Sequence, residues 1–473
     1  MSLILTSQAQ RPNTIADVKR PSANYTPSIW GDHFLSYATM EVDIKLEQHV
    51  RQLKEEVKKM LMDPLKSPSQ QLNLIDDIQR LGVSYHFKNE IDGILKQIHH
   101  NYSYGSEDDL YTTALRFRLL RQQGCNVSCD MFNKFKEGND QKFKASLLSD
   151  VSGLLSLYEA THLRIHGEGI LEEALSFTTT HLQSIKHSLS SSLSKEVAHA
   201  LMQPLRKGIN RVEARYYLSI YHERDSHNDT LLTFAKLDFN LVQKIHQKEL
   251  CEVTRWWKDL DVRNTLPFTR DKATEVYFCW ALSVYFEPQY SYARKISSKV
   301  TAMASIIDDI YDAHGTFEEL ELFTEAIQRW DVCAIDPLPD YMKVCYKALL
   351  EAYTEIEEQL AKEGKLYRIH YAREADEQKR EHVTSAVECY MKEYGATEEQ
   401  AIIELRRKLS DAWKDINESF HPPNVVPRAL LTRIINFACV MDVVYKYVDG
   451  YSTHDDTVLK DFIVSTLVQP VPV

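Results

Sequence analysis

Apolar side chains recur at steps of three and four residues along most of this chain. An early example comprises Leu46, Val50, Leu53, Val57 and Met60, with Lys and Glu residues between them. That spacing lines one face of an α-helix, whereas a half-buried strand would alternate residue by residue. The 14 Gly and 15 Pro residues each make up about 3% of the 473 residues, below the usual proportions. Because short strands and tight turns depend on such residues, the pattern predicts an all-α fold of long helices.

Few segments interrupt this helical pattern. The glycine-containing triplets 81–83 and 123–125 are typical of helix ends. The stretch 222–230 is polar, lacks large apolar residues and lies between two helical patterns, so we place a domain boundary there. The predicted organisation is a flexible N-terminal arm (1–24), an N-terminal helical domain (25–225) and a C-terminal domain (226–473).

The charge balance and the cysteine pattern exclude several functions. The chain has 56 Lys and Arg against 68 Asp and Glu, a net charge of −12, and no basic stripe, so nucleic acid is not an expected partner. Its eight cysteines are scattered without metal-ligand spacing, which favours free thiols in a reducing compartment over a zinc site. No apolar run reaches the roughly 18 residues of a membrane span, and the N-terminus lacks a signal-peptide pattern. These features predict a cytoplasmic protein with no membrane span.

The sharpest local feature is an acidic cluster at Asp308, Asp309 and Asp312. It follows an apolar helical stretch and precedes a helix-ending His314-Gly315. At positions i and i+4, Asp308 and Asp312 project from one helix face, while Asp309 points about a third of a turn away. Like charges on adjacent turns repel, so this face should need a cation, and hard carboxylate oxygens suit Mg²⁺. A solvated acidic helix end fits the spacing equally well, but the apolar lead-in and the third Asp favour a metal site.

Longer motifs carry a family resemblance. In chain order they are Arg20-Pro21 with Trp30, Leu110–Arg121, Trp280–Tyr290, Asp308–Asp312, Ala326–Asp331, Leu338–Met342, Ala412–Glu418 and Asp449–Tyr451. This succession resembles that of plant terpene synthases, in particular the cytosolic sesquiterpene synthases of the cadinene and germacrene type. The resemblance runs over nearly the whole chain.

The resemblance implies a fold and a reaction. The fold would be an N-terminal helical barrel without chemistry of its own and a C-terminal class I terpenoid synthase bundle. The reaction would be ionisation and cyclisation of farnesyl diphosphate with Mg²⁺, or alternatively Mn²⁺, as cofactor. In that scheme Asp308 and Asp312 hold the metals that bind the substrate diphosphate, and Asp309 belongs to the same metal site as the residue that orients it. A monomer with a prenyl diphosphate as its small-molecule partner is also implied.

The resemblance assigns two basic residues to substrate binding. Arg270 and Lys272 stand where the family has an Arg-x-Arg pair that captures the released diphosphate, although Lys272 lacks the bidentate fork of arginine. Without the family, a solvated loop would explain this pair. One extra residue near Cys279 should rotate the preceding residues by about 100°, unless the connecting loop absorbs the shift.

Four aromatic and acidic residues complete the implied catalytic set. Trp280 matches an aromatic residue of the pocket wall that faces the carbocation, although a core tryptophan is an equal alternative from the sequence alone. Tyr445, Asp449 and Tyr451 match the lid over the pocket, which would exclude water from the cation.

The chain departs from the family at its second metal motif, (Asn/Asp)-Asp-x-x-(Ser/Thr)-x-x-x-Glu. Only Glu377 matches a metal ligand there; Ile369 and Arg373 stand at the other ligand positions. By the resemblance about 75 residues are absent between Ala375 and Asp376, which at 1.5 Å per residue is several helices. The residues on either side of this junction, rich in Ala, Glu, Lys and Arg, predict one helix running from about 341 to 392.

Competing functions remain open at this stage. Without the second motif, a truncated, non-catalytic relative that binds prenyl diphosphate weakly or not at all is an alternative to a working synthase. A chain-elongating prenyltransferase would need two aspartate-rich motifs, and the chain has one. A class II cyclase would need Asp-x-Asp-Asp, which Asp259-Leu260-Asp261-Val262 does not provide.

Overall fold

The predicted all-α class is confirmed by a computed structural model of the chain. It describes residues 25, 27–39, 44–101, 109–138, 142–189, 191–224, 226–369, 386–423, 426–446, 450–451 and 457–473. Within these ranges the regular structure is helical except for one two-stranded antiparallel hairpin, in which Lys136 pairs with Phe143 and Glu137 with Lys142. None of the helices in the described ranges combines the length and the apolar character that crossing a bilayer requires.

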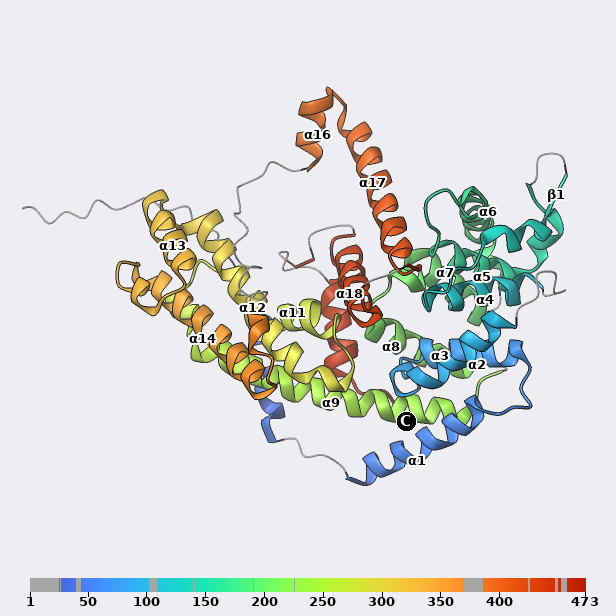
Figure 1. The fold of residues 1–473 in the computed structure, drawn as a ribbon, viewed down its shortest axis with the longest axis horizontal. Helices are drawn as coiled ribbons and strands as arrows, with labels where there is room; N and C mark the ends of the chain where they lie inside the picture. The colour runs from blue at the N-terminus through green and yellow to red at the C-terminus, as the bar shows by residue number, and fades with distance from the viewer. Residues whose placement is uncertain are drawn as a thin grey trace, which may run out of the picture. The chain divides into compact units, whose positions relative to one another are not determined.

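The helices and the two strands follow one another along the chain as shown in Figure 1. The α-helices are α1 (Ile44–Leu61), α2 (Pro68–Arg80), α3 (Lys88–His100), α4 (Leu110–Gln122), α5 (Val151–Thr161), α6 (Gly169–Ile185), α7 (Ser191–Met202), α8 (Asn210–Ile220), α9 (Asp229–Asp259), α10 (Val262–Thr265), α11 (Ala273–Val276), α12 (Ser291–Asp309), α13 (Phe317–Arg329), α14 (Asp340–Lys362), α16 (Ala386–Tyr394), α17 (Glu398–Glu418), α18 (Arg428–Val444) and α19 (Thr457–Ile463). The strands are β1 (Lys136–Glu137) and β2 (Lys142–Phe143). Three π-helical turns are η8 (Tyr277–Leu282), η10 (Ile310–His314) and η13 (Val464–Val468). The 3₁₀ helices are η1 (His33–Thr39), η2 (Ser84–His86), η3 (Cys129–Phe135), η4 (Ala145–Ser149), η5 (Lys186–Ser188), η6 (Leu205–Lys207), η7 (Tyr221–Glu223), η9 (Pro288–Tyr290), η11 (Val332–Ile335) and η12 (Leu366–Arg368).

The chain divides into two compact units. One comprises 1–27, 260–271 and 303–379; the other comprises 28–259, 272–302 and 380–473. The first contains α13, α14 and the end of α12, and the second contains the remaining long helices. The predicted domains 25–225 and 226–473 stay a prediction, and the predicted arm 1–24 lies outside the described residues.

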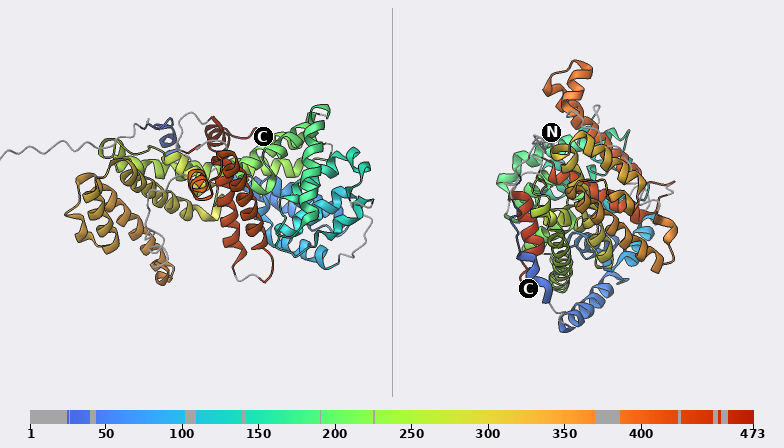
Figure 2. Two further views of the ribbon diagram at one scale, coloured as in Figure 1. Left: turned by 90° about the horizontal axis from the view of Figure 1, so that it is seen from above. Right: turned by 90° about the vertical axis from the view of Figure 1, so that its left-hand side faces the viewer.

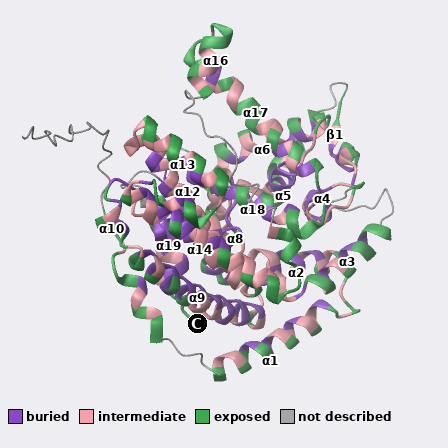
Figure 3. Ribbon diagram, turned by 60° about the vertical axis from the view of Figure 1, so that its left-hand side comes forward, coloured by how far each residue is buried: buried purple, intermediate pink, exposed green. Residues whose placement is uncertain are grey.

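Helix α1 shows why the apolar spacing produces a helix. Val50, Leu53, Val57 and Leu61 are buried on one side of it, and this side packs against α9 within the second unit. In the same unit α4 packs on α5 and α5 on α6, which can be followed in Figures 1 and 2. Figure 3 shows that buried residues line the inward side of these helices, as an amphipathic pattern requires.

Most of the predicted helix ends are confirmed. Helices α2 and α4 end at Arg80 and Gln122, directly before the triplets 81–83 and 123–125. The helical structure that begins with α12 ends at His314, as expected, but Gly315 follows with an extended backbone (φ −67°) and not a left-handed one.

The expected long helix from about 341 to 392 is wrong. Helix α14 ends at Lys362, and Gly364 adopts a left-handed conformation with φ +69°. The N–H of Lys365 then donates to the carbonyl of Leu360 (2.7 Å), and that of Gly364 to Ala361 (3.0 Å). This pairing closes a helix through a glycine, which the favourable helix propensity of the surrounding residues does not override.

The segment around Cys279, where we expect one extra residue, forms the π-helical turn η8. Here the N–H of Ser283 donates to the carbonyl of Phe278 five residues earlier (3.0 Å). A π-helical turn holds one more residue than an α-helical turn, so this turn could accommodate such an insertion; the extra residue itself stays a prediction.

A buried carboxyl group in the second unit predicts a pH dependence of stability. Glu159 on α5 is 6% exposed and accepts a hydrogen bond from the N–H of Leu205 (2.9 Å). Burial raises the pKa of its carboxyl group to about 7. The negative charge of Glu213 also raises this pKa, while the positive charges of Arg118 and Arg80 lower it. Because this pKa lies above the ordinary value of 4.5, the folded state binds the extra proton. The stabilisation of the folded state by this extra proton is fully present below pH 4.5, and it is lost as the pH rises through the folded-state pKa of about 7.

We therefore expect the free energy of unfolding to fall by about 2 kcal/mol between about pH 5 and pH 8, with much of that fall absent in Glu159→Gln. Urea unfolding of the wild type and of Glu159→Gln at both pH values measures this change in the free energy of unfolding. Replacement of the exposed Glu325 by Gln serves as the control and should leave the pH dependence unchanged. Equal pH dependence in the wild type and Glu159→Gln would refute the assignment.

Candidate active site

The acidic cluster lies at the junction of α12 and η10. Asp308 and Asp309 are the last residues of the α-helical part, and Asp312 lies in the π-helical turn. Their exposure differs: Asp309 is 2% exposed, Asp308 is half-buried and Asp312 is exposed. Within the described residues the side chain of Asp312 makes no hydrogen bond or ion pair, so its carboxylate is available to a ligand.

Arg270 organises the other two carboxylates. Its Nη2 lies 2.8 Å from Asp308 Oδ2 and 2.8 Å from Asp309 Oδ1. Its backbone N–H donates to Asp309 Oδ2 at 2.8 Å. Burial raises the pKa of the Asp309 carboxyl, and the N–H and guanidinium of Arg270 oppose that rise. Asp309 is therefore held by protein contacts, while Asp308 shares Arg270 and stays accessible.

Loss of the Asp309 carboxylate is expected to destabilise the first unit. In Asp309→Ala the backbone N–H and the guanidinium of Arg270 lose a buried partner, which should cost about 3 kcal/mol. Asp309→Asn retains an oxygen acceptor and should lose less. Thermal unfolding followed by circular dichroism compares both with Glu325→Ala, an exposed acid in the same unit, and equal melting temperatures for Asp309→Ala and that control would contradict this role.

The arrangement suits a hard divalent cation on Asp308 and Asp312. Both are carboxylates with access to solvent, as metal-binding oxygen ligands need to be. Asp309, which faces Arg270, fits the orienting role better than direct coordination. A different group of three potential metal ligands lies elsewhere in the described ranges. It consists of His166, Asp415 and Glu418, which are all exposed and whose ligand atoms lie within 4.8 Å of one another.

The basic pair predicted to bind diphosphate is divided between the two units. Arg270 belongs to the first unit and contacts Asp308 and Asp309. Lys272 belongs to the second, is 6% exposed, and places its Nζ 3.4 Å from Glu275 Oε1. In this structure each basic side chain faces carboxylates of its own unit.

The second unit assembles an aromatic cluster around Trp280. The Trp280 ring lies 6.2 Å from that of Tyr451 and 5.6 Å from that of Phe437, between ring centroids. Tyr451 is buried, whereas Tyr445 caps α18 and is 39% exposed. Edge and face contacts of this kind present π-electron density to a neighbouring cation.

Two residues of the site escaped the sequence reasoning. Phe437 lies on an exposed apolar stripe of α18, formed by Leu430, Ile434, Phe437, Met441 and Tyr445. Their steps of three and four residues were the signal that could have found it. Tyr25, whose ring centroid is 5.9 Å from the Arg270 guanidinium carbon, had no such signal. The predicted residues Asp449 and Glu377 lie outside the described residues.

Two family descriptions match the chain. "Terpene synthase, N-terminal domain" matches residues 29–201, and "Terpene synthase family, metal binding domain" matches 258–375 and 373–415. The chain belongs to the terpene synthase family. Its similarity to the (−)-germacrene D synthase of Vitis vinifera is 50% identity, covering 98% of each protein. Similarity to the (+)-delta-cadinene synthase isozyme XC14 of Gossypium arboreum is 45% identity, covering 96% of each.

Solved structures agree with the terpene synthase fold. A limonene synthase with 2-fluorolinalyl diphosphate matches with a TM-score of 0.87 and 29% identity, covering 96% of this chain and all of that one. An isoprene synthase from grey poplar, in complex with three Mg²⁺ ions and dimethylallyl-S-thiolodiphosphate, matches with a TM-score of 0.81 and 27% identity, covering 93% and 99%. The metal-binding domain and this neighbour indicate that this terpene synthase depends on a divalent metal.

The comparisons also locate the internal deletion. The metal-binding domain matches in two segments that meet at residues 373–375, where the sequence predicted the junction. The alignment with the Vitis relative spans 550 positions, and this chain has 473 residues, so at least 77 aligned positions have no counterpart here. The synthase fold is therefore retained around a shortened metal-binding domain.

Proposed function

We propose that this chain is a sesquiterpene synthase that ionises and cyclises farnesyl diphosphate and releases diphosphate. The observation that carries the proposal is a pair of solvent-accessible carboxylates, Asp308 at the end of α12 and Asp312 in η10, beside an Arg270 that binds Asp308 and Asp309. The names of the sesquiterpene-forming relatives support the substrate class.

The proposed chemistry assigns a task to each group. Asp308 and Asp312 would hold Mg²⁺, which supplies Lewis-acid chemistry to the diphosphate oxygens when bound. Ionisation breaks the allylic C–O bond, and the leaving diphosphate keeps the electron pair. We assign Arg270 and Lys272 to diphosphate binding, and Glu377 to the remainder of the metal site.

The carbocation would then be guided by the aromatic cluster of the second unit. Trp280, with Phe437 and Tyr451 beside it, offers ring faces that stabilise positive charge. Tyr445, Asp449 and Tyr451 would exclude water, and loss of a proton from the cyclised cation would give the hydrocarbon.

The proposal is tested by incubating the purified chain with farnesyl diphosphate and Mg²⁺ and analysing the extract by gas chromatography with mass detection. A cyclic sesquiterpene that disappears on addition of a chelator supports it. Parallel incubations with Mn²⁺ and with geranyl diphosphate define the metal and the chain length. Farnesol alone, or no product, from a protein with a helical spectrum would identify a non-catalytic relative.

We also propose that the protein is a cytoplasmic monomer. Light scattering of the purified chain tests the oligomeric state, and imaging of a fluorescent fusion tests the location. A dimer, or an organellar signal, would contradict the respective part.

A further inference from the structure

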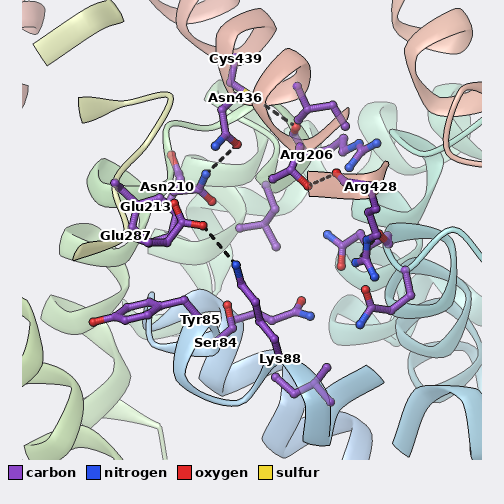
Figure 4. Close-up of a pocket in the computed structure, with 18 of the residues that line it drawn as sticks. Ser84, Tyr85, Lys88, Arg206, Asn210, Glu213, Glu287, Arg428, Asn436 and Cys439 are labelled. Atoms are coloured by element: carbon purple, nitrogen blue, oxygen red, sulfur yellow. Dashed lines mark hydrogen bonds and ion pairs between the residues drawn. The ribbon is translucent and has the colours of Figure 1, made fainter. Parts of the chain in front are cut away.

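A cavity formed by other residues than those of the candidate active site lies within the second unit. Its volume is about 400 Å³, in the range of small-ligand pockets. Residues of α2, α3, α4, η6, α8 and α18 line it. Figure 4 shows Ser84, Tyr85 and Lys88 on one side of it, with Asn436 and Cys439 of α18 on the opposite side. In that view Lys88 points toward Glu287, and Asn210 toward Asn436.

The lining of this cavity is strongly cationic. Six Lys and Arg residues line it against three carboxylates. The cations are Arg80, Lys88, Arg118, Arg206, Arg428 and Arg433, and the carboxylates are Asp92, Glu213 and Glu287. The carboxylates are already engaged: Glu287 binds Arg433 (2.8 Å), Asp92 approaches Arg428 (3.5 Å) and Glu213 approaches His199 (2.7 Å). Glu287 also faces Lys88 (3.4 Å), so one carboxylate serves two cations, and the lining carries more positive charge than its own carboxylates cancel.

Arg206 is the cation that lacks compensation. Its Nε donates to Asn417 Oδ1 (3.0 Å), and its guanidinium carbon lies 5.2 Å from the centre of the Phe420 ring. Within the described residues no carboxylate pairs with it, and its Nη2 is buried without a hydrogen-bond partner. Burial, together with the positive charge of Arg428, lowers the pKa of Arg206 to about 10. An unpaired guanidinium charge and a buried N–H donor without an acceptor both cost free energy, and a bound anion would relieve both costs.

Two further arginines of the wall leave donors unused. The Nε atoms of Arg80 and Arg118 are buried without partners, although each side chain pairs with a carboxylate, Glu196 (3.2 Å) and Asp76 (2.5 Å) respectively. An anion with several oxygens would meet more of these donors than a single carboxylate could. Phosphate groups present three such oxygens and match the planar fork of arginine.

We propose that this cavity binds a small phosphate-bearing anion, with Arg206 and Arg428 as its principal ligands and without a metal ion. The side chain of Arg428 is 45% exposed, so solvent reaches this part of the lining, whereas Nη2 of Arg206 is buried. Inorganic phosphate, inorganic diphosphate and the diphosphate end of an isoprenoid share this chemistry.

Isothermal titration in a chelating buffer of low salt tests the site, because the metal-dependent site is inactive under those conditions. Inorganic diphosphate is expected to bind, with an affinity reduced about tenfold or more in both Arg206→Gln and Arg428→Gln. Arg407→Gln removes an exposed arginine of α17 that pairs with Glu404 and Asp411, and it should bind like the wild type. Titrations with inorganic phosphate and farnesyl S-thiolodiphosphate show which source binds more tightly.

Other outcomes separate this site from the proposed catalytic one. Asp308→Asn should leave metal-free diphosphate binding unchanged, whatever its effect on turnover. Arg206→Lys keeps the charge, so it should retain part of the affinity if the glutamine variant fails to fold. No binding to the wild type, or binding that Asp308→Asn abolishes and Arg428→Gln leaves intact, would overturn the proposal.

Discussion

In Asp308→Asn we expect hydrocarbon formation from farnesyl diphosphate to fall by about 100-fold or more. Asn keeps the size of the side chain but removes a negative oxygen ligand, and the loss of several kcal/mol of transition-state stabilisation corresponds to two or more factors of ten. The interaction of Asp309 with Arg270 stays in place, so the fold should be retained. Initial rates from radiolabelled substrate, with circular dichroism as a check of folding, measure the effect.

The matched control is Glu325→Gln, an exposed acid on α13 in the same unit. Its rate should equal that of the unmodified chain. If Asp308→Asn retained full turnover, the cluster would be the solvated acidic helix end that its spacing also fits.

The second large effect is expected from restoring the missing segment. A chimera that carries the corresponding residues of the Vitis relative between Ala375 and Asp376 should turn over farnesyl diphosphate at least about tenfold faster than the native chain. The reason is the second metal motif, whose ligands would hold further Mg²⁺, and this added positive charge would neutralise diphosphate charge that metal held by Asp308 and Asp312 alone leaves uncompensated. Product yield per unit time, together with the product spectrum, measures the gain.

A second chimera separates metal binding from simple closure of the pocket. It carries the same insert with the ligand positions of the motif replaced by Ala. A gain in the first chimera that the second lacks assigns the effect to the metal ligands. If the native chain already matched the first chimera in rate and product, the shortened domain would be sufficient for catalysis.

The sequence alone determined the helical class and many helix ends. Apolar steps of three and four residues, as in Val50, Leu53 and Val57, depend on the geometry of a single helix and need no knowledge of the partner surface. The same holds for the acidic cluster, which was located by its spacing and its apolar lead-in. The end of α14 at Gly364 is also a local signal, because a glycine in the left-handed conformation closes the helix whatever the helix propensity of the residues around it.

The tertiary structure decided which side chains meet. Arg270 and Asp309 are 39 residues apart, and Trp280 and Phe437 are 157 apart, so no local pattern could pair them. The cationic cavity combines residues from α2 to α18, and its excess charge appears only when the partners of each arginine are known. Periodicity fixes the face that a helix buries, whereas long-range packing fixes what that face meets, and the chemistry of this protein depends on the second.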